Sequence, residues 1–339
     1  MRPDSASFRQ FRLNTPRASL SSDDVQHGRP RQRGPLAPFV LPDRDMVHNS
    51  HDPYDSPPLR GLGPVQATLR VFVALQCWGY AAAHLHFGAK SALARVLEQE
   101  FYLSAGDTAL VDQGAAICLA ACGMMCLLRP AWPVLLGLFF GEVAFVGSKA
   151  FLGEGGHPAI IAARHAANVL SPLILACADF WPGRRKFSLG FWIAIAAMMH
   201  VAVCASCIGN GLEGLIESHQ GGDLVRVATG AVEKFTRQTP SPADAKTALA
   251  IASAIQLGVG LALLLNRSRQ AAGAAAVVGV FLAGCYSLGL GMAGYPRTLT
   301  HLVEGGVAAA LCLFWSNATR HGEMSYVPDL PVQKARGGH

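Results

Sequence analysis

Long apolar runs, separated by polar connections, fill most of the chain after residue 68 and limit what it can fold into. A helix of about 20 apolar residues spans the hydrocarbon core of a bilayer. Because the runs are continuous and do not alternate with polar residues, they predict helices and not the strands of a membrane barrel. Eight runs of roughly this length are present, at residues 69–87, 109–128, 131–152, 158–181, 187–208, 247–265, 271–293 and 296–316.

The composition agrees with an integral membrane protein. Of the 339 residues, 51% are hydrophobic and only 15% are charged, whereas a soluble globular protein carries about 25% charged residues. We therefore predict an all-α integral membrane protein with eight transmembrane helices.

The two ends of the chain differ from the rest. Residues 1–67 are rich in Pro, Ser, Asp and Arg and contain few apolar clusters. Such a composition buries too little apolar surface to offset the entropy lost on ordering, so we expect a disordered tail. The start, MRPDSASFRQFRLN, lacks the apolar segment of a secretory signal peptide. The first membrane helix is then an uncleaved anchor, and residues 320–339 form a second tail.

The basic residues lie at the ends of the predicted helices and indicate the topology. Connections 182–186 and 266–270 fall on the same side of an eight-helix protein and carry a local excess of Lys and Arg. Cytoplasmic connections carry such an excess, so we expect both termini and both tails in the cytoplasm of a bacterium, with the helices in its inner membrane. The net charge of +6 then reflects topology, and the expected partner is the lipid bilayer and not nucleic acid.

The order of the connections indicates an internal duplication. The longest ones, 88–108 and 209–246, each follow the first helix of a group of four. Repeats of this kind are best sought before other features. Because four is an even number, the halves, 68–183 and 184–319, are expected to be parallel four-helix repeats. Aligning 70–97 with 186–213, 136–145 with 278–287, and the fourth helices with each other places His84 on His200, His165 on His301, and Asn168 on Glu304.

Both long connections contain amphipathic segments. SALARVLEQEFYLS and LVRVATGAVEKFTRQ space their apolar residues three or four apart, as helices do. Two interpretations remain open: helices that lie in the membrane surface, or loop helices that pack over the bundle.

The end of the first apolar run carries a family resemblance. CWGYAAAHLHFGAK, residues 77–90, has an aromatic residue and a glycine, then His84 or His86, Gly88 and Lys90. This ending resembles that of the DoxX-like family of four-helix membrane proteins. The resemblance covers 68–181, and it reaches 187–316 only through the repeat, because MMHVAVCASCIGN keeps the histidine but lacks the glycine and lysine. It implies the four-helix fold and, from a few family members, a quinone-linked redox role with a membrane redox partner.

Histidines inside the apolar runs are the main candidate site residues. His84 and His165 lie at similar depth on helices that run in opposite directions, at ~1.5 Å per residue, and His200 and His301 repeat this in the second half. We expect His84 to face His165, and His200 to face His301, in the outer third of the membrane. Arg164 adjoins His165, so one of the two is expected to meet its own bundle and the other the neighbouring half or the headgroups, which Arg164 is near enough to the surface to reach.

Three interpretations of these polar residues compete. Facing imidazoles are ligands for a haem iron or a divalent metal. A histidine with a carboxylate instead suits a proton-coupled site such as a quinone pocket, and Glu142, Lys149 and Glu304 supply further ionisable groups. In the third interpretation, these groups pair with one another and with carbonyls and lock the helices together.

The nine cysteines offer one further candidate site. Cys118, Cys122 and Cys126 form a stripe of small residues suited to close helix packing. Cys204 and Cys207 share a helix face with His200, which suits a dithiol couple, a zinc or copper site, or simple packing.

Two classes of function follow from these features. One is a redox-associated protein that interacts with a quinone or an electron carrier. The other is a non-enzymatic transporter or membrane scaffold.

Overall fold

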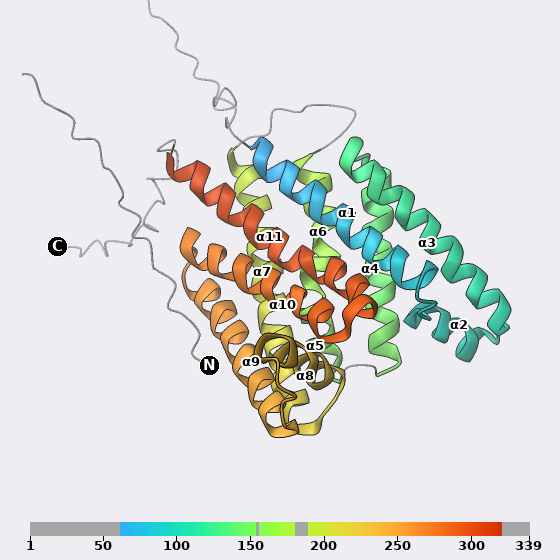
Figure 1. The fold of residues 1–339 in the computed structure, drawn as a ribbon. Coiled ribbons are helices and arrows are strands. Elements are labelled where there is room, and N and C mark those ends of the chain that lie inside the picture. The colour runs from blue at the N-terminus through green and yellow to red at the C-terminus, as the bar shows by residue number, and fades with distance from the viewer. Residues whose placement is uncertain (1–61, 154–155, 180–188, 321–339) are drawn as a thin grey trace, which may run out of the picture. The chain divides into compact units, whose positions relative to one another are not determined.

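The computed structural model describes residues 62–153, 156–179 and 189–320, and 88% of these residues are helical, with no strand among them. The predicted all-helical class is therefore confirmed (Figure 1). Helix α1 begins at Gly63, so the end of the predicted disordered tail, at 63–67, is helical instead. The rest of that tail, the basic connection 182–186 and the tail beyond residue 320 lie outside the described residues.

The first half of the described chain forms six helices. They are α1 (Gly63–Leu85), α2 (Ala92–Phe101), α3 (Ala105–Leu128), α4 (Trp132–Phe151), α5 (Pro158–Arg164) and α6 (Ala166–Ala178). The second half forms α7 (Leu189–Gln220), α8 (Asp223–Thr236), α9 (Pro242–Leu265), α10 (Arg269–Leu290), a short 3-10 helix η1 (Gly291–Gly294) and α11 (Tyr295–Arg320). Within the described residues, each predicted apolar run falls mainly on one of these helices, except that 158–181 falls on α5 and α6 and 271–293 on α10 and η1.

Five stretches of helix are long and apolar enough to cross a membrane, or six when the bent pair α5 and α6 counts as one span. One of the five, Arg269–Asn317, contains α10, η1 and α11, and α10 and α11 pack against each other. Helix α1 is not among them, since Gln66, Arg70 and Gln76 interrupt its apolar sequence. The described residues thus support a multi-pass membrane protein, by length and composition.

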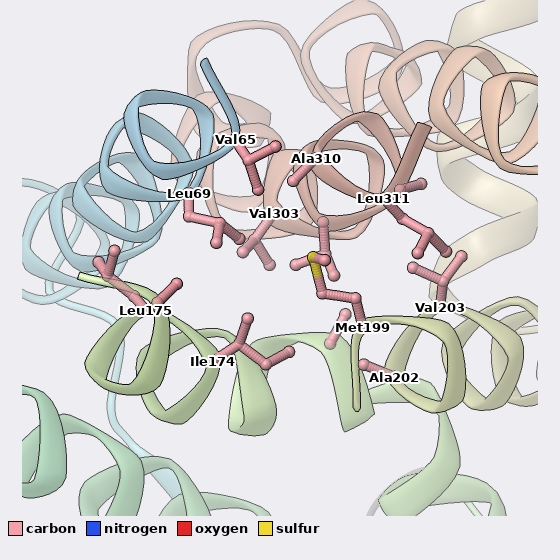
Figure 2. Close-up of a cluster of buried hydrophobic side chains, with 14 of the residues drawn as sticks. Val65, Leu69, Ile174, Leu175, Met199, Ala202, Val203, Val303, Ala310 and Leu311 are labelled. Atoms are coloured by element: carbon pink, nitrogen blue, oxygen red, sulfur yellow. The ribbon is translucent and has the colours of Figure 1, made fainter. Parts of the chain in front are cut away.

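Four central helices form the core of the bundle. Val65 and Leu69 of α1, Ile174 and Leu175 of α6, Met199 of α7 and Val303 and Leu311 of α11 meet there (Figure 2). The packing crosses between the halves, because α1 packs on α11 while α7 packs on α5 and α6. The first helix of each half thus packs against the last helix, or pair of helices, of the other half.

The outer helices present apolar side chains to their surroundings. Helices α3, α4, α9 and α10 each expose several large hydrophobic residues, among them Ile117, Phe140, Ile251 and Val277. Contiguous exposed apolar surface of this kind is rare on soluble monomers and suits helices that face lipid.

Both amphipathic connections are helical, as predicted, and both pack on the bundle. Helix α2 contacts α3 and α4, and α8 contacts α9 and α10. Asp112 of α3 fixes the start of α2 by accepting hydrogen bonds from the amide of Ser91 at 2.9 Å and from its hydroxyl at 2.5 Å. Gly230 of α8 and Gly289 of α10 have no side chain to separate their backbones, so these helices touch directly.

The predicted single helix at 158–181 is wrong in one respect: it is broken at His165, where α5 and α6 meet at 46°. The amide of Ala167 donates to the hydroxyl of Ser206 on α7 at 2.8 Å. Gly209 of α7 lies against the backbone of Ala163 and Arg164. Close contact with α7 therefore satisfies the backbone at the break.

Candidate functional site

A polar cavity of about 430 Å³ lies between the two halves, at the end of the bundle where α2 and α8 lie. Of the predicted site residues, it is lined by His84 of α1, Lys149 of α4, Arg164 and His165 at the α5–α6 break, and His301 of α11. The structure therefore brings these five residues to one central cavity. Its volume falls within the range of roughly 300–1,000 Å³ typical of small-molecule sites.

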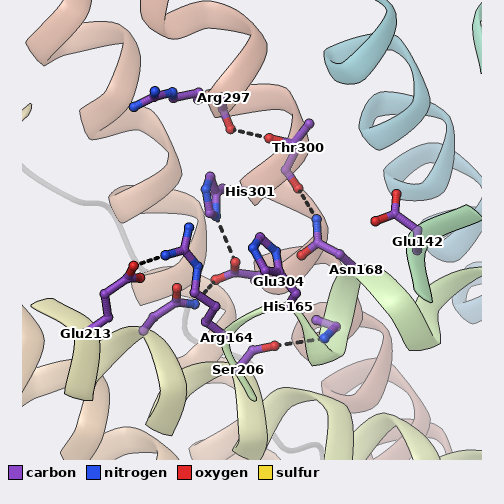
Figure 3. A network of polar contacts seen from close by, with 12 residues as sticks. Glu142, Arg164, His165, Asn168, Ser206, Glu213, Arg297, Thr300, His301 and Glu304 are labelled. Atoms are coloured by element: carbon purple, nitrogen blue, oxygen red, sulfur yellow. Dashed lines mark hydrogen bonds and ion pairs between the residues drawn. The ribbon is translucent and has the colours of Figure 1, made fainter. Parts of the chain in front are cut away.

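Arg164 is held by an ion pair across the two halves. Its guanidinium pairs with the carboxylate of Glu213 on α7 (Figure 3). Both side chains are largely buried, with 18% and 7% of their surface exposed. Of the expected surroundings, the neighbouring half and the headgroups, Arg164 thus meets the neighbouring half. A second pair, Arg297 with Asp223 at 3.4 Å, lies at the exposed rim.

Lys149 and His165 form a contact between two ionisable groups at the cavity wall. The Lys149 Nζ lies 3.3 Å from the His165 Nε2 and 4.4 Å from the centre of the Phe145 ring. Because an ammonium group only donates hydrogen bonds, Nε2 accepts, and the neutral imidazole carries its proton on Nδ1.

Three polar atoms around the break have no hydrogen-bond partner within the described part of the chain: Arg164 Nε, His165 Nδ1 and Asn168 Oδ1. All three residues line the cavity, and His165 and Asn168 are only 4% and 2% exposed. Buried polar atoms are normally hydrogen-bonded, and leaving one unpaired costs about 1–3 kcal/mol. Their arrangement is suited to water or to a polar ligand that both accepts and donates hydrogen bonds.

The cavity lining carries an excess of positive charge. Five of its side chains are Lys or Arg and three are Asp or Glu, which leaves two positive charges when histidine is neutral. These charged residues are Lys90, Arg95, Lys149, Arg164, Arg297, Glu213, Glu217 and Asp223. An electron-rich oxygen atom is favoured in such surroundings over a cation.

A surface ion pair with helix α2 holds one of these cations, Lys90, beside the cavity. Lys90 pairs with Glu98, whose second oxygen accepts a hydrogen bond from Thr108 at 2.6 Å. The bonds from Lys90 and Thr108 hold the pKa of Glu98 below its usual value. This contact fastens α2 beside the cavity.

Glu142 of α4 is the acceptor in a hydrogen-bonded network of the first half. It accepts from Gln76 Nε2 at 2.7 Å and from the Tyr80 hydroxyl at 3.2 Å. Gln76 also donates to the carbonyl of Asn168. That carbonyl lacks its usual helical partner because Pro172, four residues later, has no N–H. The carbonyl that Pro172 leaves free thus links α6 to Gln76 of α1 and, through Gln76, to Glu142.

An apolar groove of about 400 Å³ adjoins the polar cavity between α1, α3 and α4. Glu142 and Asp112 lie in it, and its walls are otherwise mostly apolar. Tyr80, His84 and Phe145 line both the groove and the polar cavity. The two spaces therefore meet at these side chains.

His84 lies at this junction. Its Nδ1 lies 2.5 Å from the carbonyl of Ala89, and a carbonyl only accepts, so the neutral ring keeps Nε2 as an acceptor. His84 and His165 share the cavity, but no direct contact joins them among the described interactions.

The second half has a related arrangement around Glu304. Its Oε2 accepts from Asn210 of α7 at 2.8 Å, and its Oε1 lies 2.8 Å from His301 Nδ1. The ring of His301 stacks on the ring of Tyr286, with their centres 4.7 Å apart. A cavity of about 250 Å³ begins at His301 and Glu304 and extends under α8.

The structure places His200, Cys204 and Cys207 away from these cavities. His200 is ten residues before Asn210 on α7, or about 15 Å along the helix, so the expected contact of His200 with His301 does not form. Cys204 and Cys207 are buried and free, and Cys207 packs against Gly260 of α9. Among the described residues, no three His, Cys, Asp or Glu side chains are arranged to hold a metal ion.

Several residues of the site were not predicted as site residues. Gln76 and Tyr80 stand in the first apolar run, and Asn210 and Glu213 in a stretch that the prediction assigned to a connection. For Gln76 and Tyr80, their place as polar residues inside an apolar run was the available signal, because such residues face the interior of a bundle. No match to this chain is found among protein-family models, curated proteins or solved structures.

Proposed function

We propose that the chain is a DoxX-like membrane protein of eight transmembrane helices, arranged as two parallel four-helix repeats. The crossed packing of α1 on α11 and of α7 on α5 and α6 supports this. Gly79 and Gly209 also have matching places, since each touches the backbone of the fourth helix of the other half.

The helix starts give independent support for the repeat. Ser104 caps α3 and Ser241 caps α9, each by accepting from the amide of an aspartate three residues later. Helix α3 and helix α9 both have 24 residues. Each follows a short amphipathic helix, α2 or α8. In this arrangement the basic connections are cytoplasmic and α2 and α8 lie on the outside of a bacterial inner membrane.

We further propose that the first half binds an isoprenoid quinone or quinol in a redox-associated role. The observation that carries this proposal is the meeting of a polar cavity and an apolar groove at Tyr80, His84 and Phe145. A quinone has a polar ring and a hydrocarbon tail, so the ring suits the junction and the tail suits the groove between α3 and α4.

The side chains at the junction suit the proton chemistry of a quinone. Reduction to quinol takes two electrons and two protons, and both oxygens change from acceptors to donors. His84 Nε2 is an acceptor for a quinol hydroxyl, while Lys149 supplies a donor for a carbonyl oxygen. Glu142 accepts a hydrogen bond from the Tyr80 hydroxyl, so a proton can pass from the junction to Glu142 through Tyr80. The electrons come from a membrane redox partner.

A binding measurement with a quinone analogue tests this function. Purified protein in lipid nanodiscs is titrated with a short-tailed ubiquinone and a short-tailed menaquinone, and binding is followed calorimetrically. Quinones extracted from the protein as purified are identified by chromatography, and a visible spectrum with elemental analysis reports any haem or metal. Saturable binding that is lost on filling the groove by Gly137→Phe supports the proposal. Binding that is absent, or unchanged in Gly137→Phe, contradicts it.

Solute transport is the second candidate function. The observation that favours it is the place of the polar cavity between the two halves, where transporters with parallel repeats bind their substrates. In that case the protein moves a small solute across vesicle membranes. Uptake into proteoliposomes without quinone binding distinguishes this function from the first.

A further inference from the structure

The cavity of the second half has the character of a separate ligand site. It measures about 250 Å³ and lies between α7, α8, α9, α10 and α11. Phe235 of α8 and Phe281 of α10 line it and stack at 6.1 Å. Both rings are more than half exposed, at 60% and 55%. They lie on the exposed surface of α8 and α10, beside the cavity.

Two buried polar side chains face this cavity without a partner. Gln256 and Ser253 of α9 are 6% and 4% exposed, and both line the cavity. Across the described residues, neither side chain makes a hydrogen bond. A carboxamide offers both a donor and an acceptor, and a buried one is normally satisfied. Gln256 therefore points to a ligand that carries a hydrogen-bonding group.

The charges around the cavity restrict this ligand to an uncharged molecule. Among the described residues, no Lys or Arg lines the cavity, and Glu304 is its single carboxylate. Both oxygens of Glu304 are already engaged, one by Asn210 and the other by His301. An anion would meet Glu304 without a compensating cation, while a cation would have to compete with Asn210 and His301.

We infer that the second half binds an uncharged amphipathic molecule whose carbonyl or hydroxyl head meets Gln256 and whose hydrocarbon part passes Phe235 and Phe281. This site adds to the proposed quinone function by providing a second site in the other repeat. A quinone and a long-chain alcohol both have this chemistry, and competition between them identifies the source.

Photolabelling tests the inference. The full-length protein in nanodiscs is irradiated with an azido-ubiquinone that has a short alkyl tail, and labelled peptides are mapped by mass spectrometry. We expect label within 223–236 and 279–286. Gln256→Leu should lower that label about fivefold at subsaturating probe, the effect of losing one neutral hydrogen bond. Label within 105–151 reports binding in the first-half groove. If the proposed first-half function fails, that label is lost while the second-half label remains, so the two outcomes can be distinguished.

A filling variant and its control separate loss of the site from loss of the fold. Ala252 of α9 lines the cavity, whereas Ala254 is exposed on the same helix. Ala252→Phe should abolish the second-half label, and Ala254→Phe should leave it unchanged. Competition by the unlabelled quinone alone identifies a quinone site, and equal competition by a saturated alcohol identifies a general lipid-alcohol site. The inference is overturned if neither competes, or if the label persists in both Gln256→Leu and Ala252→Phe.

Discussion

Arg164 of α5 and Glu213 of α7 form an ion pair that joins the two halves of the chain. The arginine lies next to the break at His165, in a segment that is otherwise mostly apolar. The ion pair explains the arginine in this apolar segment, because it fixes α5 to α7 at the wall of the polar cavity.

Removing one member of this pair should destabilise the protein. Arg164→Leu leaves the Glu213 carboxylate buried without its cation, and breaking a buried pair in this way costs about 3 kcal/mol. The double variant Arg164→Leu with Glu213→Leu should recover most of that loss. Equilibrium unfolding in mixed micelles measures both. A single variant as stable as the wild type would show that the pair does not hold α5 to α7.

Gly209 should not tolerate a side chain. A Cβ there would lie 2.7 Å from the carbonyl carbon of Ala163, so Gly209→Ala must push α5 away from α7, at a cost of about 1–3 kcal/mol. Gly258→Ala is the matched control, since a Cβ at Gly258 meets nothing within 4 Å. Thermal unfolding of the two variants should therefore diverge, with only Gly209→Ala lowering the midpoint.

His84 and His200 should differ in their effect on quinone binding. His84 stands where the polar cavity meets the apolar groove, so His84→Ala should weaken binding about fivefold by removing one hydrogen bond. His200 lines none of the three cavities, and His200→Ala should bind as the wild type does. Calorimetric titration gives both dissociation constants. Equal losses in the two variants would place the ligand elsewhere.

Helices α2 and α8 should be reached by reagents from outside the cell. Cysteines introduced by Glu100→Cys and Arg226→Cys lie at exposed positions of these helices. A membrane-impermeant maleimide should label them in intact cells, with the wild type giving the background from native thiols. Asn266→Cys, at the other end of α9, should react only after permeabilisation. The reverse pattern would invert the proposed topology.

Acid should loosen α2. The pKa of Glu98 is held below its usual value by Lys90 and Thr108, so its contribution to stability is present above the unfolded pKa, about 4.3. It is lost as the pH falls through the lower folded value. Hydrogen exchange should show the amides of 92–101 losing protection over this acid range in the wild type. Glu98→Gln removes the titrating group, and its exchange should not respond to the same pH change.

The positions of the helices could be predicted from the sequence because hydropathy reports which segments avoid water. Runs such as 109–128 and 247–265 fall within α3 and α9 and end at the same residues as these helices. The amphipathic pattern likewise located α2 and α8. These features depend on local sequence alone.

The end of α7 could not be predicted in this way. The prediction ended that helix at 208, but α7 continues to Gln220. Its last turns contain Gly209, Gly211 and Glu213, which look like a polar connection yet pack on neighbouring helices. Hydropathy cannot distinguish a segment that faces water from one that faces another helix.

The error at α7 carried over to the site. With α7 ended too early, His200 was aligned with His84 and expected near the outer surface. The structure brings together Lys149, Arg164, His165 and His301 instead. The break at His165 was also missed, since its stabilising contacts come from Ser206 and Gly209, about 40 residues later in the chain.

The crossed packing of the halves has a consequence for how the protein is made. Helix α1 is synthesised first among the described helices, yet it packs on α11, which is synthesised last. Helices α5 and α6 in turn wait for α7. During biosynthesis the first half cannot complete its packing in the membrane before the second half arrives, so a ribosome that stops between them releases a chain whose central helices lack their partners.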